Sequence, residues 1–201
     1  MIKAFVFDWG NVLYLMDLEG FRTEISSTYN LDKKRFSEIE LEERLKLDFG
    51  DITLDEFFDA LDTRLEIQIE REKYKETFFS KYVRINEELV EVVKTLKEQG
   101  FLLFILSNNN PSMVEHMKKH TDFEQIFDNI IVSYQEKMKK PDQKFYEKVL
   151  EGRDLKFEEC VSLDDREDLV DAAAKLEMIS LLYTSVEAFK KELKELGVNL
   201  E

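Results

Sequence analysis

Two adjacent aspartates, Asp164 and Asp165, directly follow the apolar run 160–163. Neighbouring carboxylates repel each other and raise each other's pKa unless a cation binds between them. Magnesium prefers carboxylate and water oxygens as ligands, and a third acid, Asp168, follows soon after. Core packing gives no reason for acids at the end of a buried run, so we predict a metal site here.

A further aspartate, Asp8, follows the apolar run 4–7. An ionised carboxylate in such a place is costly unless a cation or hydrogen-bond donors satisfy it. A carboxylate can also act as a nucleophile and form an aspartyl-phosphate. Gly10 lies two residues later, where it allows a sharp turn of the chain. Taken alone, the motif fits an aspartate that caps a turn equally well.

Two other segments carry groups that suit an anion. Ser107 and Asn108 follow the run 101–106, and the hydroxyl and backbone amides there could bind phosphate at the start of a helix. Lys140, held in extended geometry by the following Pro141, could supply the local cation that an anion site needs in so acidic a chain. Taken singly, an unliganded helix cap and a solvated lysine explain these segments as well.

These residues follow short apolar runs that we expect to form strands. The runs do not alternate with polar residues, so they fit strands buried on both faces: 4–7, 101–106, 130–132, 160–163 and 178–183. Stretches with helical period lie between them: 87–99, 112–119, 144–150, 169–176 and 186–196. This alternation predicts an α/β fold, a Rossmann-like parallel sheet with helices on both faces. The carboxyl ends of such strands meet in one crevice, where the candidate residues should gather.

The segment 14–83 has a different character. It is highly charged, has helical period and contains no strand-like run. Thr53 and Glu56 have the spacing of a capping box at a helix start. We therefore predict two domains: an α/β core of residues 1–13 and 84–201, and an all-helical cap, 14–83, inserted after the first strand and overhanging the crevice.

The amino-acid composition indicates where the protein is located and which partners it does not bind. The chain has 201 residues, 43% of them hydrophobic, which suffices for one core with a small inserted module. A net charge of −15 disfavours nucleic acid and anionic membranes as partners. No stretch approaches the roughly 18 apolar residues of a membrane span. The single cysteine, Cys160, fits a buried thiol in a reducing cytosol. We expect a cytoplasmic monomer.

The ordered set of motifs resembles the haloacid dehalogenase (HAD) superfamily over nearly the whole chain. Asp8 falls on the nucleophile of that family, Ser107 on its second motif and Lys140 on its lysine before proline. Asp164 and Asp165 fall on its acidic fourth motif, and Asp168 on a position that is often acidic there. The segment 48–53, with Glu56 and Phe57, is similar to caps of a subgroup that contains sugar-phosphate phosphatases and the phosphatase-like domain of soluble epoxide hydrolases.

The resemblance implies a magnesium-dependent phosphohydrolase that acts on a small phosphorylated metabolite. Asp8 would attack phosphorus, and water would hydrolyse the aspartyl-phosphate. Mg²⁺ would be held by the carboxylates of Asp8 and Asp164 and by the carbonyl of Gly10, with Asp165 beside them. Ser107, Asn108 and Lys140 would bind the phosphate. Trp9, next to the nucleophile, is expected either to line the entrance and contact substrate or to pack in the core.

Gly10 departs from the pattern of the family's phosphatases. They usually carry a second aspartate here, whose general acid–base assistance is worth about 10²–10⁴-fold in rate. Two alternatives therefore stay open. In the first, the chain is a HAD-fold binding or regulatory protein that has lost the acid. In the second, it is a metal-independent 2-haloacid dehalogenase, a class of enzyme that needs no second aspartate. The fourth motif of such dehalogenases is not a double acid, so Asp164 and Asp165 weigh against the second alternative.

Two histidines, His116 and His120, stand one helical turn apart, as in some zinc sites. No third ligand at a suitable spacing is evident. A solvated helix face therefore explains the pair better than a metal does.

Overall fold

The computed structural model describes residues 1–200. Its centre is a five-stranded parallel sheet with the strand order β5-β4-β1-β6-β7. The strands confirm all five predicted runs: β1 (Ala4–Phe7), β4 (Leu102–Ser107), β5 (Asn129–Val132), β6 (Cys160–Asp164) and β7 (Ile179–Leu182). Phe7 at the end of β1 pairs with Ile105 of β4 and Leu163 of β6. The carboxyl ends of these three strands are therefore level.

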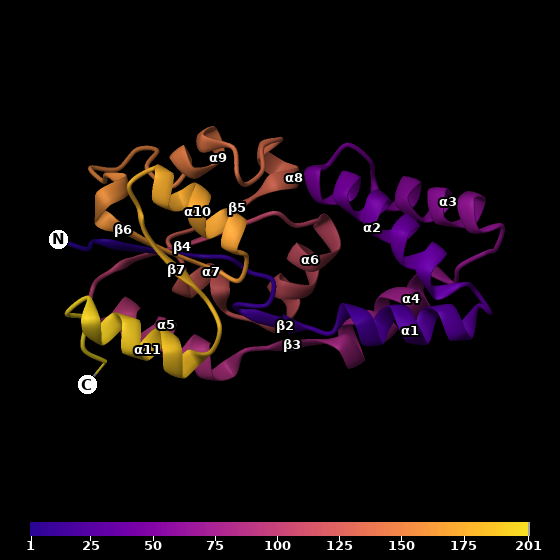
Figure 1. Ribbon diagram of the computed structural model, residues 1–201, viewed down its shortest axis with the longest axis horizontal. Helices are drawn as coiled ribbons and strands as arrows, with labels where there is room; N and C mark the ends of the chain where they lie inside the picture. The colour runs from indigo at the N-terminus through magenta and orange to yellow at the C-terminus, as the bar shows by residue number, and fades with distance from the viewer. Residues whose placement is uncertain (201) are drawn as a thin grey trace.

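Helices cover both faces of the sheet, as expected (Figure 1). Phe5 and Phe7 of β1 belong to the apolar cluster on one face, with helices α5 (Glu87–Glu98), α6 (Pro111–His120), α7 (Phe123–Ile126) and α11 (Val186–Glu195). Ala4 and Val6 belong to the cluster on the other face, with α9 (Gln143–Glu147) and α10 (Glu167–Lys175). Successive strand residues point to opposite faces, so apolar side chains at consecutive positions bury the strand completely.

The inserted segment forms a separate helical layer beyond the carboxyl ends of the strands (Figure 1). Phe36, Phe58 and Leu61 centre an apolar cluster of its own. The helices are α1 (Leu18–Thr28), α2 (Lys33–Phe49), α3 (Leu54–Leu65), α4 (Arg71–Thr77) and the π-helical turn η1 (Phe78–Tyr82). We refer to this layer as the cap.

The prediction that 14–83 contains no strand was wrong at both ends. Tyr14–Met16 forms β2, which pairs antiparallel with β3 (Val83–Ile85). Each strand is three residues long, too short to show an alternating pattern in the sequence. The two connections between core and cap thus run side by side as a ribbon. Asn86 fixes its core end by donating to the carbonyl of Val12 at 2.8 Å.

The cap also contacts the core at the C-terminal end of α2. The Asn110 amide donates to Asp48 Oδ1 at 2.8 Å, and the hydroxyl of Ser133, in the short helix α8 (Ser133–Glu136), donates to the backbone carbonyl of Asp48. Gly50 ends α2 with a φ of 77°, and a Cβ there would lie 2.9 Å from the carbonyl oxygen of Tyr134. Glycine therefore satisfies both the left-handed turn and the close approach.

The two ends of the described chain, residues 1 and 200, lie at the end of the core that faces away from the cap (Figure 1). Cys160 is buried and has no disulfide partner, as predicted, and burial raises the pKa of its thiol to about 12. Across residues 1–200, no helix has both the length and the apolar character needed to cross a membrane.

The capping box predicted from Thr53 and Glu56 is present at the start of α3. Thr53 Oγ1 accepts from the Glu56 amide at 3.2 Å, and Glu56 Oε2 accepts from the Thr53 amide at 2.7 Å. We expect Thr53→Ala to lower the free energy of unfolding by about 1 kcal/mol, because the Glu56 amide loses its side-chain acceptor. Urea denaturation measures this. Thr63→Ala, on the exposed face of the same helix, is the control. Equal losses for both variants would contradict a specific role of the cap.

Candidate active site

Three aspartates meet at the level carboxyl ends of β1 and β6. Asp8 directly follows β1, and its backbone amide donates to the carbonyl of Leu163 in β6 at 2.9 Å. Asp164 is the last residue of β6, and Asp165 follows it. One carboxylate oxygen from each of the three aspartates lies within 4.8 Å of the others. This confirms the expectation that the first and fourth motifs converge.

Lys140 lies between two of these acids. Its Nζ is 2.7 Å from Asp8 Oδ1 and 2.5 Å from Asp164 Oδ2, and its side chain is 3% exposed. Asn108 positions the backbone of Lys140, because its side-chain amide donates to the Lys140 carbonyl at 3.0 Å and accepts from the Lys140 amide at 2.8 Å. Asn108 also lines the cavity, as expected of a phosphate-binding residue. Both polar atoms of its side chain are engaged with the Lys140 backbone, so it also positions the lysine.

The electrostatics of the cluster favour a further cation. Burial opposes the charged form of Lys140, but the carboxylates of Asp8 and Asp164 outweigh burial and raise the lysine pKa above its ordinary value. Burial also raises the pKa of Asp164 and of Asp165, against the lowering effects of Lys140 and Asn11 respectively. Three ionised carboxylates and one ammonium leave two negative charges in a poorly solvated place. A divalent metal ion would neutralise them.

The two acids of the fourth motif have different surroundings. Asp164 is 3% exposed, and its oxygens accept from Lys140 Nζ and from the Arg166 amide. Asp165 accepts from the Asn11 amide at 3.0 Å and lines the cavity above the sheet. Asp165 is thus better placed than Asp164 to offer an oxygen to a metal ion, although the resemblance favoured Asp164.

A cavity of about 180 Å³ opens over the cluster, between the core and the cap. Six predicted residues line it from the core: Asp8, Gly10, Ser107, Asn108, Lys140 and Asp165. Ser107, the last residue of β4, lines this cavity and is only 1% exposed. The cavity therefore combines a possible nucleophile, a cation and a hydroxyl in one place.

Comparison with known proteins identifies the family. The sequence profile described as haloacid dehalogenase-like hydrolase matches residues 2–177. The chain belongs to the haloacid dehalogenase-like hydrolases. This hydrolase is similar to the sesquiterpene phosphatase astK of Aspergillus oryzae, with 32% identity over 57% of the chain, and to the drimenol cyclase drtB of Aspergillus calidoustus, with 27% identity over 96%. The matches span 58% and 36% of the lengths of those two relatives.

Solved structures share the fold of this HAD-like hydrolase. A HAD family enzyme of Bacteroides thetaiotaomicron superposes with a TM-score of 0.82 at 23% identity, covering 96% of this chain and 98% of that one. A structure of the same enzyme with magnesium and inorganic phosphate superposes at 0.78 with 22% identity, covering 92% and 96%. The L-2-haloacid dehalogenase of Xanthobacter autotrophicus has a TM-score of 0.63 at 19% identity, covering 97% and 83%.

Trp9 does not line the cavity of this HAD-like hydrolase, so of its two expected positions the core is correct and the contact with substrate is wrong. Its side chain is fully buried, and its ring stacks on Tyr14 with centroids 5.9 Å apart. Trp9 belongs to the same apolar cluster as Phe5 and Phe7, the alternate residues of β1. The strand period of two places Asp8 on the opposite side. Continuing that alternation past Phe7 would have predicted the burial.

Asp168 and the histidine pair also lie outside the cluster. The Asp168 carboxylate pairs with Arg166 at 2.6 Å on the surface. His116 stacks on Phe79 of the cap with ring centroids 4.2 Å apart, so it is not simply solvated, as the sequence suggested. Of the residues described, the three aspartates alone form an acidic group with metal-binding geometry.

The sequence analysis missed Arg44 and Asp48, which line the cavity from the cap, and Asn110, which lines it from the core at the start of α6. Arg44 pairs with Asp48 at 3.1 Å, four residues along α2. Burial raises the pKa of Asp48 to about 6, although Arg44 and Asn110 lower it. The spacing of the acids and Arg44 along α2 is the signal that could have revealed them.

We expect Lys140→Met to destabilise the protein by about 3–5 kcal/mol in the absence of divalent cations, because two buried carboxylates lose their counterion. Thermal and urea unfolding in the presence of a chelator measure the loss. The matched control is Lys139→Met, one residue away and exposed. A loss no larger than that of the control would show that the acids are stabilised without the lysine.

Proposed function

We propose that this HAD-like hydrolase is a magnesium-dependent phosphomonoesterase that acts on a small phosphorylated metabolite through an aspartyl-phosphate on Asp8. The convergence of Asp8, Asp164 and Asp165 within 4.8 Å, beside Lys140, carries the proposal. The name of the Aspergillus oryzae relative, a phosphatase, supports it. The magnesium and phosphate complex of the Bacteroides thetaiotaomicron enzyme supports the choice of metal and of ligand.

The donor set fits Mg²⁺. Asp8, Gly10 and Asp165 line the cavity, and Asp8, Asp164 and Asp165 each bring a carboxylate oxygen within 4.8 Å of the others. Gly10 would add its backbone carbonyl, as the family resemblance implies. These are hard oxygen donors with room for water, as magnesium requires. Bound Mg²⁺ would stabilise negative charge on the phosphoryl oxygens in the transition state.

In the first step, a carboxylate oxygen of Asp8 attacks phosphorus, and the bond from phosphorus to the ester oxygen breaks. Lys140 holds Oδ1 of Asp8 by a 2.7 Å contact, which leaves Oδ2 as the attacking atom. The Lys140 ammonium, the Ser107 hydroxyl and nearby backbone amides would hold the phosphoryl oxygens. The departing alkoxide takes a proton from water, because no acidic side chain exists at position 10.

In the second step, water attacks phosphorus of the aspartyl-phosphate, and the bond from phosphorus to Asp8 breaks. Inorganic phosphate leaves, and the carboxylate is regenerated. Lys140 again offsets the charge that returns to Asp8. Because the proton leaves the attacking water without a general base at position 10, this step also depends on solvent.

We expect Asp8→Asn to lower phosphate release from 4-nitrophenyl phosphate with Mg²⁺ by about 10³-fold or more, since an amide is a poor nucleophile. Asp171→Asn, an exposed acid on α10, is the matched control and should retain activity. Unchanged release by Asp8→Asn would refute the nucleophile. Chloride release from 2-chloropropionate without metal would indicate a dehalogenase instead.

Gly10→Asp tests the missing acid. A Cβ at position 10 would meet only the terminal methyl of Met16 at 2.7 Å, a flexible group that can move. We expect Gly10→Asp to raise kcat for alkyl phosphates by about tenfold or more, and kcat for aryl phosphates by less, because poor leaving groups need protonation most. Gly10→Asn, which is similar in size but cannot act as an acid, is the control. Equal effects on both ester classes would mean that the proton has another source.

A further inference from the structure

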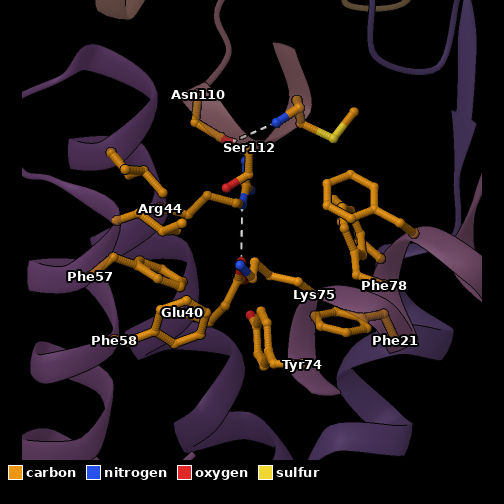
Figure 2. Close-up of a pocket in the computed structure, with 15 residues that line it drawn as sticks. Phe21, Glu40, Arg44, Phe57, Phe58, Tyr74, Lys75, Phe78, Asn110 and Ser112 are labelled. Atoms are coloured by element: carbon orange, nitrogen blue, oxygen red, sulfur yellow. Dashed lines mark hydrogen bonds and ion pairs between the residues drawn. The ribbon is translucent and has the colours of Figure 1, made fainter. Parts of the chain in front are cut away.

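A second cavity, of about 60 Å³, lies between the cap and the start of α6, next to the catalytic cavity. Figure 2 shows the rings of Phe57 and Phe58 on one side of it, those of Phe21 and Phe78 on the other, and Tyr74 between them. Its walls are therefore mainly aromatic and aliphatic. We refer to it as the aromatic pocket.

The aromatic pocket adjoins the catalytic cavity directly. Five residues line both: Leu18, Arg44, Phe78, Asn110 and Met113. Three of these five are large apolar side chains. A ligand whose phosphate sits beside Asp8 can therefore extend past an apolar boundary into the aromatic pocket.

The charged groups of the aromatic pocket are already paired. Glu40 contacts Arg44 at 3.1 Å, as the dashed line in Figure 2 marks, and Arg22 at 2.5 Å. Arg44 also contacts Asp48 at 3.1 Å, and Lys75 at the rim pairs with Glu72 at 2.6 Å. Each positive charge thus has a negative partner within this set. A charged substituent that entered would find no free counterion and would lose hydration.

Several apolar side chains of the pocket are only half-buried. Leu54, Phe78 and Phe79 are intermediate in exposure, although they line a recess of the cap. They have apolar surface that the protein does not cover. An apolar ligand group in the pocket would remove that surface from water, at about 25 cal/mol per Å².

We propose that the aromatic pocket receives the organic part of the substrate, and that the substrate is the phosphate monoester of an uncharged, mainly apolar alcohol. This proposal rests on the proposed function. It disfavours the sugar phosphates that the subgroup resemblance suggests, because several hydroxyl groups would face aromatic walls. By volume, the pocket takes a short aliphatic group rather than a ring, since a cavity of about 150 Å³ accommodates one benzene.

The experiment measures the binding of non-hydrolysable n-alkylphosphonates, from methyl to butyl, to the wild-type protein with Mg²⁺ by calorimetry. We expect the Kd to fall by about fourfold for each added methylene. 2,3-Dihydroxypropylphosphonate, close in size to the butyl compound, should bind about tenfold or more weakly than it. A Kd that does not depend on chain length, or tighter binding of the dihydroxy compound, would overturn the proposal.

A charged side chain introduced into the aromatic pocket tests whether the alkyl chain of the phosphonate binds there. Leu54 is the first residue of α3, where an acid is favourable for the helix, so Leu54→Asp should fold. We expect it to abolish the gain from methyl to butyl. Leu45→Asp, which adds the same charge at a position 53% exposed on α2, is the matched control and should retain the gain. If both variants retain it, the alkyl chain binds elsewhere.

These outcomes are separable from failure of the proposed function. Release of phosphate from 4-nitrophenyl phosphate is followed in parallel on the same samples. Chain-length-dependent binding without phosphate release would support the aromatic pocket and refute the hydrolysis. Phosphate release without such binding would support the hydrolysis and refute the aromatic pocket.

Discussion

The ion pairs of Lys140 with Asp8 and Asp164 make the rest of the site possible. Like charges at the ends of two adjacent buried strands would be strongly unfavourable without a counterion, because the sheet and its helices exclude water. The lysine comes from a loop distant in sequence, and Asn108 fixes that loop through both ends of its amide. The ammonium of Lys140 therefore holds the ends of the two strands together. It also sets the negative charge that remains for a metal ion.

Helix α2 contributes side chains to both the catalytic cavity and the aromatic pocket. Its residues Glu40, Arg44 and Asp48 follow one another at intervals of one helical turn. Arg22 of α1 also pairs with Glu40, so two basic side chains balance the two acids. Arg44 can therefore line both cavities without attracting an anionic substituent. The last turn of the helix reaches the core at Asn110, so the wall of the aromatic pocket and the edge of the catalytic cavity have a common support. A shift of α2 would change both.

The predictable features depend on patterns that are local in the chain. The apolar runs that end in acids predict two of the strands, β1 and β6. Neighbouring parallel strands bring their carboxyl ends together, so the sequence predicts that Asp8 and Asp165 lie close to each other. The short ribbon of β2 and β3 was not found, since pairing between segments about 70 residues apart leaves no local pattern in three residues. Arg44 was missed as well. Its spacing of four residues from Glu40 and from Asp48 indicates ion pairs along α2, but its position beside the cavity depends on tertiary contacts between cap and core. The position of Trp9 stayed open between the core and the cavity, although the alternation of β1, continued beyond Phe7, indicates the core.

The position of the two chain ends has a practical consequence. The two ends of the described chain lie at the end of the core that faces away from the cap (Figure 1). The two cavities lie between core and cap. A polypeptide joined at either end would emerge away from the mouth of the site, and a surface tether at either end would present the cavities to solution. The architecture is thus suited to serve as a module in a larger chain or on a solid support without obstruction of substrate entry.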